Sequence, residues 1–397
     1  MNNSLVNRFL EYVKIDTTST ENSSTYPSTE NQIVLLEKLA NELIDLGLQV
    51  DFDKKYVIAK LPKVDSSTTI AFIAHVDTSN AVSGKNVKPI ITPNYQGGDI
   101  VLPYITVPAG DLSSYIGKTI ITSDGSTLLG SDDKAGVAEI MEVAEYLMKN
   151  PDKKRCNVVI VFTPDEEIGR GTDYLDVAKV GADFGYTVDG GRLGCMEYEN
   201  FNACGFNLTI NGISVHPGSG KGVLKNAIDL FAEFHAMLPE NERPVTTCGY
   251  EGFYMVNSVK GGVENLTANY LIRDFDKNNF EDRKEYIRKC LDLLNEKYGK
   301  DTFVGELKDS YYNMKDEIVK NPKIIELANK SFYDCGVKPN SSPIRGGTDG
   351  SKLSFMGLPC PNLSYGGANA HSRKEYAVVE DMQKMVEILV KITENFA

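Results

Sequence analysis

Short apolar runs of this sequence repeatedly end in side chains that can bind metal ions. Three of these runs are TTIAFIAHVD, NVVIVFTPDEE and ADFGYTVDGG, and two further candidates follow TLLGS and LPCPNLSYGG. Imidazole nitrogen combined with carboxylate oxygen, without thiolate, suits Zn²⁺, with Co²⁺ or Mn²⁺ as possible substitutes. The candidates are His75, Asp77, Asp132, Asp165, Glu166, Glu167, Asp189 and His371.

The charge of these groups indicates how many ions they would hold. Asp132, Glu166, Glu167 and Asp189 would bring four negative charges into one pocket. An isolated cluster of that kind would become protonated or unfold the protein, whereas two divalent cations would balance it. The sequence therefore predicts a centre with two ions. Their presence would explain why Glu166 and Glu167 stand side by side at the end of a buried strand.

Neighbouring acids can divide the chemistry between them. Adjacent residues of an extended chain point in opposite directions. One of Glu166 and Glu167 can therefore bind a metal while the other acts as general base on a metal-activated water. His75 and Asp77 are two residues apart and lie on one face of a strand, where Asp77 can orient the imidazole.

Several candidates also have a purely structural alternative. Asp132 can cap the helix that it opens, and Asp189 can stabilise the turn Val-Asp-Gly-Gly. The protein has four histidines, of which His235 lies within an ordinary helical pattern and is expected to be a packing residue. His216 lies in the turn-rich segment SVHPGSGKG, where it can be a site residue or the cap of the next helix.

The elements that must position these groups indicate an α/β sheet. The three apolar runs alternate with helical patterns, as expected for a parallel sheet with helices on both faces. Ligands bind at the carboxyl ends of the strands in such sheets, so the candidates should converge there. We expect helices over 28–50, which begins with a capping-box-like Thr29–Gln32 pair and stops near Gly47, and over 132–150. The passage 83–126 is rich in Gly and Pro and is expected to be rich in β-structure.

A second domain is expected to interrupt the first. From about residue 204 to 315 the pattern changes to strands and helices typical of a compact α+β layer. A helical segment at 321–336 and an apolar strand at 358–367 then resume the sheet domain. We therefore expect a discontinuous catalytic domain, 1–203 with 316–397, and an inserted α+β domain, 204–315.

Composition excludes several classes of partner. The chain has 397 residues, a net charge of −13 and 41% hydrophobic residues. A charge of this sign argues against nucleic acid or an acidic membrane as partner, since both need a basic surface. The sequence contains no signal-peptide pattern and no apolar stretch of membrane-spanning length. Seven scattered cysteines without CxxC spacing predict reduced thiols and a cytoplasmic location.

The ordered set of motifs resembles a known family. AHVDTS, LLGSDDKAG, TPDEEIG, TVDGG, SVHPGSGKG, RGGTDGS and NAHSRKEYA occur in this order. Together they resemble the tripeptide aminopeptidases (the peptidase T group) of the co-catalytic zinc exopeptidases. Carboxypeptidases, dipeptidases and N-acyl amino acid deacylases belong to the same group. The resemblance covers nearly the whole chain and implies a zinc-exopeptidase-like α/β catalytic domain with an inserted α+β lid of the dimerisation type.

The resemblance also implies a role for each candidate. Two zinc ions would be bridged by Asp132, with His75 and Asp189 completing one site and Glu167 and His371 the other. Glu166 would be the general base, and Asp77 would orient the imidazole of His75. The lid histidine, His216, would polarise the scissile carbonyl, and Arg345 in PIRGGTDG would meet the substrate's carboxylate or carbonyl.

Other activities stay open at this stage. The stretch PYITVPAGDLSSYI departs from the tripeptidase pattern by being shorter, so peptides of other lengths remain candidate substrates. The alternatives are a dipeptidase or an N-acyl amino acid deacylase of the same group, or a non-catalytic peptide-binding protein. Glu166 argues against a pure binding protein, which needs no base beside its metals. We expect short peptide substrates and a monomer or homodimer.

Overall fold

A computed structural model describes residues 3–397, and these form two compact units. Unit 1 comprises Met1–Tyr198, Met314–Ser342 and Thr348–Ala397, and unit 2 comprises Glu199–Asn313 and Pro343–Gly347. The predicted division, 1–203 with 316–397 against 204–315, differs from these units by a few residues at each boundary, at 199–203 and 314–315, and at one further segment. Residues 343–347 lie with unit 2, because Arg273 Nη1 donates to the Arg345 carbonyl and Arg345 Nη1 donates to the Gly249 carbonyl.

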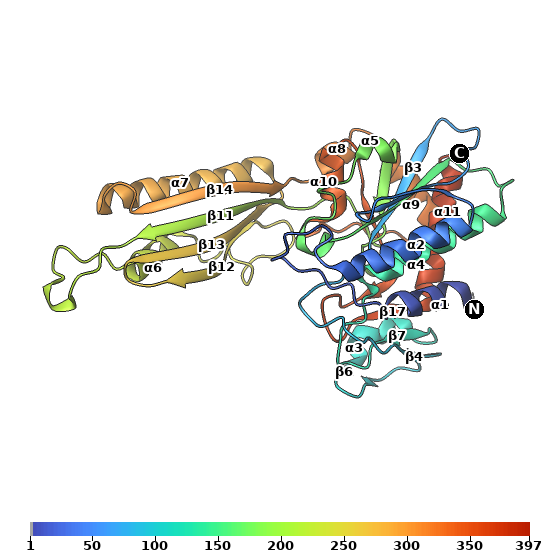
Figure 1. Cartoon of the computed structure of the whole chain (residues 1–397), viewed down its shortest axis with the longest axis horizontal. Coiled ribbons are helices and arrows are strands. Elements are labelled where there is room, and N and C mark those ends of the chain that lie inside the picture. The colour runs from blue at the N-terminus through green and yellow to red at the C-terminus, as the bar shows by residue number, and fades with distance from the viewer. Residues whose placement is uncertain (1–2) are drawn as a thin grey trace. The chain divides into compact units, whose positions relative to one another are not determined.

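Unit 1 is built around a seven-stranded mixed sheet (Figure 1). Its central strands are parallel, and antiparallel strands close both edges. The predicted apolar runs form the three central strands, which confirms the α/β class. In spatial order the strands are β1 (Gln49–Phe52), β2 (Val57–Lys60), β8 (Asn157–Thr163), β3 (Thr69–His75), β9 (Phe184–Thr187), β15 (Asn362–Leu363) and β10 (Met196–Glu197).

Helices bury both faces of this sheet, which is why its central strands are apolar on both sides. On one face Ile73 and Val161 pack with Val180 of a short helix and Leu353 of another. On the other, the ring of Phe184 packs against that of Phe396 just after the last helix. The helices of unit 1 are α1 (Asn3–Tyr12), α2 (Glu30–Asp45), α3 (Ala109–Leu112), α4 (Ser131–Lys149), α5 (Val177–Val180), α8 (Lys315–Ile318), α9 (Lys323–Asp334), α10 (Asp349–Phe355) and α11 (Val379–Asn395).

Helix α2 confirms the helix expected over 28–50 but lacks the predicted capping box. Gly47 ends it with φ 91°, a left-handed conformation that glycine adopts without a steric cost. Thr29 occupies the N-cap position without accepting a side-chain cap hydrogen bond. Gln32 Nε2 donates to Thr29 Oγ1 at 3.1 Å and also to the Asp165 carboxylate. The box is absent because the Gln32 amide is directed toward Asp165.

The passage 83–126 is β-rich as predicted and contributes to a smaller sheet of unit 1. In this four-stranded sheet, strands of the passage 83–126 pair with strands that follow residue 366. The hydrophobic core beside the sheet includes Val107, Ile120 and Tyr376. A separate two-stranded sheet lies within the passage. The strands are β16 (Gly367–Ala368), β17 (Tyr376–Val378), β7 (Ile120–Thr122) and β4 (Ile90–Thr92), with β5 (Ile100–Val101) and β6 (Thr106–Val107) forming the pair. The predicted strand 358–367 is shorter than expected and consists of β15 and the first residue of β16.

Unit 2 is the predicted α+β layer, with two helices on one face of an antiparallel sheet. Phe206 and Tyr270 of the sheet pack against Phe234 and Ile287 of the helices. Along β13 exposed and buried residues alternate strictly over its first six positions, as expected for a sheet covered on one face. The sheet order is β12 (Phe253–Gly261), β13 (Asn265–Asp274), β11 (Asn202–Asn211) and β14 (Phe303–Tyr311), and the helices are α6 (Ala227–Met237) and α7 (Lys277–Tyr298).

None of the helices within residues 3–397 is both long enough and apolar enough to cross a membrane.

Candidate active site

The predicted metal-binding side chains of unit 1 converge at the carboxyl ends of the central parallel strands of the large sheet. Strand β3 lies between β8 and β9, parallel to both. His75 ends β3 and pairs with Thr163 at the end of β8, and Asp189 follows β9. The carboxyl ends of neighbouring parallel strands meet, so residues far apart in sequence become neighbours. Asp132, in the first turn of α4, joins them there.

Asp132 lies between two pairs of the predicted ligands. Its Oδ1 lies 3.0 Å from His75 Nε2, and its Oδ2 lies 3.3 Å from His371 Nε2. His75 Nε2 is also 3.7 Å from Asp189 Oδ1, and His371 Nε2 is 2.8 Å from Glu167 Oε2. Each carboxylate oxygen of Asp132 therefore faces a different histidine, and each histidine faces a further acid.

The ionisation of these groups shows how closely their charges interact. Burial disfavours the charged form of His75, but hydrogen bonds to Asp132, Asp189 and Asp77 outweigh it and raise the imidazole pKa well above the ordinary value. Hydrogen bonds to Asp132 and Glu167 raise the pKa of His371 to about 11. Burial raises the pKa of Asp189 and of Glu167. The neighbouring carboxylates thus favour the charged form of each imidazole, and divalent cations would compete for the same nitrogen atoms.

The donor set fits metal ions better than a folded ion-pair network. Glu167 Oε1 and Asp133 Oδ1 are buried and have no hydrogen-bond partner within residues 3–397. Leaving a buried carboxylate oxygen unpaired is costly, whereas a bound cation would satisfy it. Ligand atoms of His75, Asp132 and Glu167 lie within 4.8 Å of one another, as do those of His75, Asp133 and Asp189.

Asp133 was not among the sequence-predicted candidates. It is fully buried, and its Oδ2 accepts a hydrogen bond from the His75 backbone N–H at 3.2 Å. Burial, with the nearby Asp189 carboxylate, raises its pKa well above the ordinary value. The motif LLGSDDKAG did contain a signal for this residue, because it places two acids side by side where one is enough to begin a helix. The second acid, Asp133, could therefore have been considered as a further site residue.

Glu166 and Glu167 do not lie in an extended strand, so the reason given for their division of labour was wrong. They begin a short 3₁₀ turn, Glu166–Ile168, which follows Asp165 in a left-handed conformation with φ 55°. Their side chains nevertheless have different neighbours. Glu167 contacts His371, whereas Glu166 lines a small cavity with His75, Asp189 and other residues. The turn, not strand alternation, separates the two acids.

Asp77 contacts both this turn and the imidazole of His75. Its Oδ1 accepts from the Glu166 N–H at 2.9 Å, and its Oδ2 accepts from the Glu167 N–H at 3.2 Å. His75 Nδ1 lies 3.2 Å from Asp77 Oδ1 and 3.1 Å from the Asp77 carbonyl. The predicted contact with the imidazole is present, and the two backbone contacts are additional.

Asp77→Asn is expected to lower kcat by about 10- to 100-fold, the usual effect of altering the group behind a metal-bound histidine. The new amide nitrogen would face a backbone N–H of the turn, so that one of the two hydrogen bonds is lost. Steady-state kinetics and metal analysis measure the effect. Asp381→Asn is the matched control, because Asp381 is a buried aspartate paired with Lys118 and does not belong to the site. Equal loss in both variants would contradict a specific role for Asp77.

Two further buried acids support the site, and both lie in motifs already noted. Glu375 of NAHSRKEYA accepts hydrogen bonds from the N–H groups of Leu129, Gly130 and Asp132 and from Ser131 Oγ, at 2.8 to 3.0 Å. It therefore fixes the start of α4. Asp349 of RGGTDGS begins α10, lines the same cavity as Glu166 and accepts from Thr163 Oγ1 at 2.8 Å. Burial raises its pKa to about 6.

His216 and Arg345 belong to unit 2. His216 is exposed, and its Nδ1 accepts from the Gly218 N–H at 3.2 Å, which caps the 3₁₀ turn Pro217–Ser219. Arg345 is bonded to a loop of its own unit: Nη1 donates to the Gly249 and Glu251 carbonyls and Nη2 to Thr247 Oγ1. These contacts support the role of a loop-stabilising arginine, and the substrate contact stays a prediction. His235, expected to be a packing residue, stacks on Phe231.

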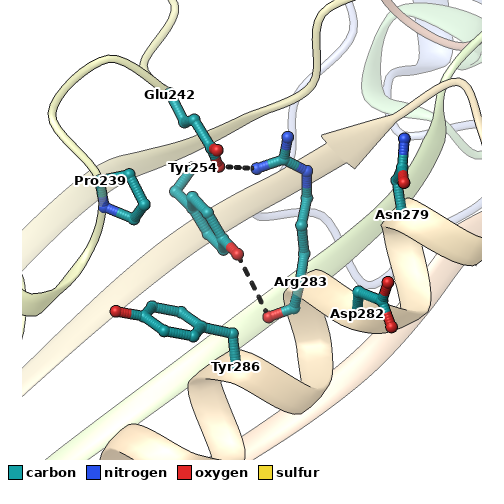
Figure 2. A pocket seen from close by; sticks show the side chains of 7 residues that line it. All are labelled: Pro239, Glu242, Tyr254, Asn279, Asp282, Arg283 and Tyr286. Carbon is teal, nitrogen blue, oxygen red and sulfur yellow. Dashed lines mark hydrogen bonds and ion pairs between the residues drawn. The ribbon is translucent and has the colours of Figure 1, made fainter.

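The large pocket of unit 2 contains no group of metal-binding residues (Figure 2). It has a volume of about 380 Å³ and is lined by Tyr254, Tyr286 and Arg283, among others. The Arg283 guanidinium is already paired with Glu242 and with Asp274. Tyr254 donates to the Arg283 carbonyl at 3.4 Å. The guanidinium of the pocket is thus already paired within unit 2, whereas the predicted metal ligands lie in unit 1.

Comparison with known proteins adds independent information. Residues 107–395 match the model of peptidase family M20/M25/M40. A protein named peptidase T from Caldanaerobacter subterraneus is 51% identical over 402 residues, which cover 99% of this chain and 98% of the relative. The crystal structure of the aminopeptidase PepT from Bacillus cereus aligns with a TM-score of 0.81 at 23% identity, over 99% of this chain and 98% of that one. A dinuclear metal-binding peptidase from Bacillus subtilis aligns with a TM-score of 0.68 at 14% identity, over 98% and 96% of the two chains.

Proposed function

The chain belongs to peptidase family M20/M25/M40 and is an aminopeptidase of that family, and we propose that it releases the N-terminal residue of tripeptides with the help of two divalent metal ions. The arrangement around Asp132 carries this proposal. Its two carboxylate oxygens face two histidines, and each histidine faces another acid. A carboxylate placed between two such half-sites is suited to bridge two cations.

The donor chemistry favours Zn²⁺. One ion would be held by His75, Asp189 and Asp132, and the other by His371, Glu167 and Asp132. All of these donors are nitrogen or oxygen, which suits zinc and also permits Co²⁺ or Mn²⁺. Bound there, the ions would lower the pKa of a shared water, polarise the scissile carbonyl and stabilise negative charge on its oxygen.

Glu166 is the proposed general base. It lines the cavity beside His75 and Asp189 but makes no ion pair with either histidine within the described residues. Burial raises the pKa of its carboxyl well above the ordinary value. A raised pKa suits a group that must take a proton from water and return it to the leaving amine. Asp77 keeps the turn that carries this base in place.

His216 is proposed to act on the substrate and not on the metals. Its ring is fixed through Nδ1 by the Gly218 N–H, and its Nε2 makes no hydrogen bond within residues 3–397. An imidazole held this way can donate from Nε2 to the oxygen on which negative charge develops, a contact that is stronger in the transition state than in the ground state.

His216→Ala is expected to lower kcat by about 10²-fold or more with metal content intact, as for other lost oxyanion donors. His216→Asn is the matched variant, because asparagine can still cap the turn but cannot reach as far. Kinetics with a tripeptide separates the two roles. If His216→Asn restores the wild-type kcat, the histidine is only a cap and its proposed role in catalysis has to be abandoned.

The proposed activity is tested with a panel of di-, tri- and tetrapeptides and N-acyl amino acids. The protein is first treated with a chelator and then supplied with Zn²⁺, Co²⁺ or Mn²⁺. We expect metal-dependent release of the N-terminal residue from tripeptides, and no cleavage of the same tripeptides with an acetylated N-terminus. A preference for dipeptides or N-acyl amino acids, or binding without cleavage under all three metals, would contradict the proposal. The cytoplasmic location and the monomeric or homodimeric state stay predictions.

A further inference from the structure

The turn that carries the proposed base is held at three consecutive backbone N–H groups. The Asp165 N–H donates to Gln32 Oε1 at 3.0 Å. The next two N–H groups, of Glu166 and Glu167, donate to the Asp77 carboxylate. Gln32 and Asp77 are both fully buried. Gln32 lies in α2, 133 residues before Asp165, so the turn is fixed from two distant segments.

Gln32 also binds the side chain of the same residue. Its Nε2 donates to Asp165 Oδ1 at 2.7 Å, so both ends of the amide engage Asp165. The Ser28 N–H donates to Asp165 Oδ2 at 2.7 Å, and Ser28 Oγ donates to Oδ1. Asp165 is fully buried and is one of the few non-glycine residues with positive φ. Such residues require support from their surroundings, and here Gln32 and Ser28 provide it.

We propose that Gln32 is a positioning residue for catalysis, acting through Asp165 on Glu166. The direction in which the Glu166 side chain leaves the backbone depends on the dihedral angles of the residue before it. The amide–carboxylate pair fixes those angles. Displacing a catalytic group by about 1 Å can cost 10²-fold in rate. This inference rests on the proposed role of Glu166 as general base. Within residues 3–397 the Gln32 side chain hydrogen-bonds to Ser28, Thr29 and Asp165, and to none of the proposed metal ligands.

The first test replaces Gln32 by methionine, which has a similar length and cannot hydrogen-bond to Asp165. We expect kcat for a tripeptide to fall about 10- to 100-fold, with KM and a content of two metal ions unchanged. In a protein that already carries Glu166→Gln, Gln32→Met should cause no further loss, because the group it positions is absent. Two substitutions that act through one group are non-additive in this way.

The second test exchanges the partners. Gln32→Glu alone places two carboxylates against each other and should lower kcat. Combined with Asp165→Asn, it restores the pair with donor and acceptor reversed, because the new carboxylate accepts from the new amide and from the backbone N–H. The double variant should therefore recover most of the wild-type kcat. Gln383→Met is the control, because Gln383 in α11 is also a glutamine with a buried amide nitrogen, but that nitrogen has no partner in residues 3–397. Its kcat should be unchanged.

The possible failures are distinguishable. A wild-type protein that cleaves no peptide refutes the proposed function, whatever the variants do. An active wild-type protein with an unchanged Gln32→Met rate refutes the positioning role alone. So does a further loss of rate from Gln32→Met in the Glu166→Gln protein, or a fall in kcat that follows metal content, since both indicate a structural role.

Discussion

Glu166→Gln is expected to lower kcat by about 10²- to 10⁴-fold, the usual contribution of a general base, with two metal ions still bound. Glutamine has nearly the same shape but cannot take up the proton of the attacking water. Glu166 lines the cavity beside the proposed ligands but makes no ion pair with a histidine within residues 3–397. Rates with a saturating tripeptide and metal analysis of the same sample measure both quantities.

The neighbouring residue provides the control for this experiment. Glu167→Gln has the same chemistry one position later, but Glu167 Oε2 lies 2.8 Å from His371 Nε2. This variant should therefore lose metal as well as activity. If Glu166→Gln keeps more than about a tenth of the wild-type rate, Glu166 is not the general base. If it loses metal as Glu167→Gln does, the two acids share one role.

The second large effect concerns the histidines. His75→Ala and His371→Ala should each lower the metal content by at least one ion per chain, and activity should be lost with it. Each substitution removes the only imidazole of one half-site, and a nitrogen ligand contributes strongly to zinc affinity. Loss of both ions in either variant is consistent with the arrangement, because Asp132 faces both histidines.

His235→Ala is the matched control for this measurement. His235 stacks on Phe231 and hydrogen-bonds with the Tyr270 hydroxyl in unit 2, and it is not among the proposed ligands. Its removal should leave both ions bound. Metal analysis after dialysis against metal-free buffer provides the test. Unchanged metal content in either His75→Ala or His371→Ala would contradict the assignment of these two ligands.

The parts of the fold that depend on local pattern could be predicted from the sequence. The apolar runs predicted β3, β8 and β9, because strands buried on both faces have few polar residues. The rule that ligands gather at the carboxyl ends of parallel strands then placed His75, Asp189 and the Glu166–Glu167 pair together. The helix after Asp132 followed from its periodicity. These inferences needed no knowledge of distant contacts.

The parts that depend on distant contacts could not be predicted. The 3₁₀ turn at Glu166 is stabilised by Asp77 and Gln32, which no local propensity of the turn reveals. The Thr29–Gln32 capping box failed for the same reason, since the amide bonds to Asp165. The adjacent acids Asp132 and Asp133 were visible in the sequence, but the role of Asp133 could not be predicted, because it depends on the hydrogen bond that its carboxylate accepts from the His75 N–H.

All five proposed ligands come from unit 1, and they follow different strands or begin different segments, from His75 to His371. No contiguous peptide of the unfolded chain can reproduce this set, so metal affinity should appear only when unit 1 is folded. By thermodynamic linkage, the binding free energy then adds to the unfolding free energy of unit 1, by about 2.7 kcal/mol when free metal is a hundred times the dissociation constant. Unit 2 supplies no proposed ligand, so metal binding does not directly add to its unfolding free energy. The supply of metal in the cell would thus set the lifetime of the sheet domain against unfolding and degradation, in addition to its catalytic activity.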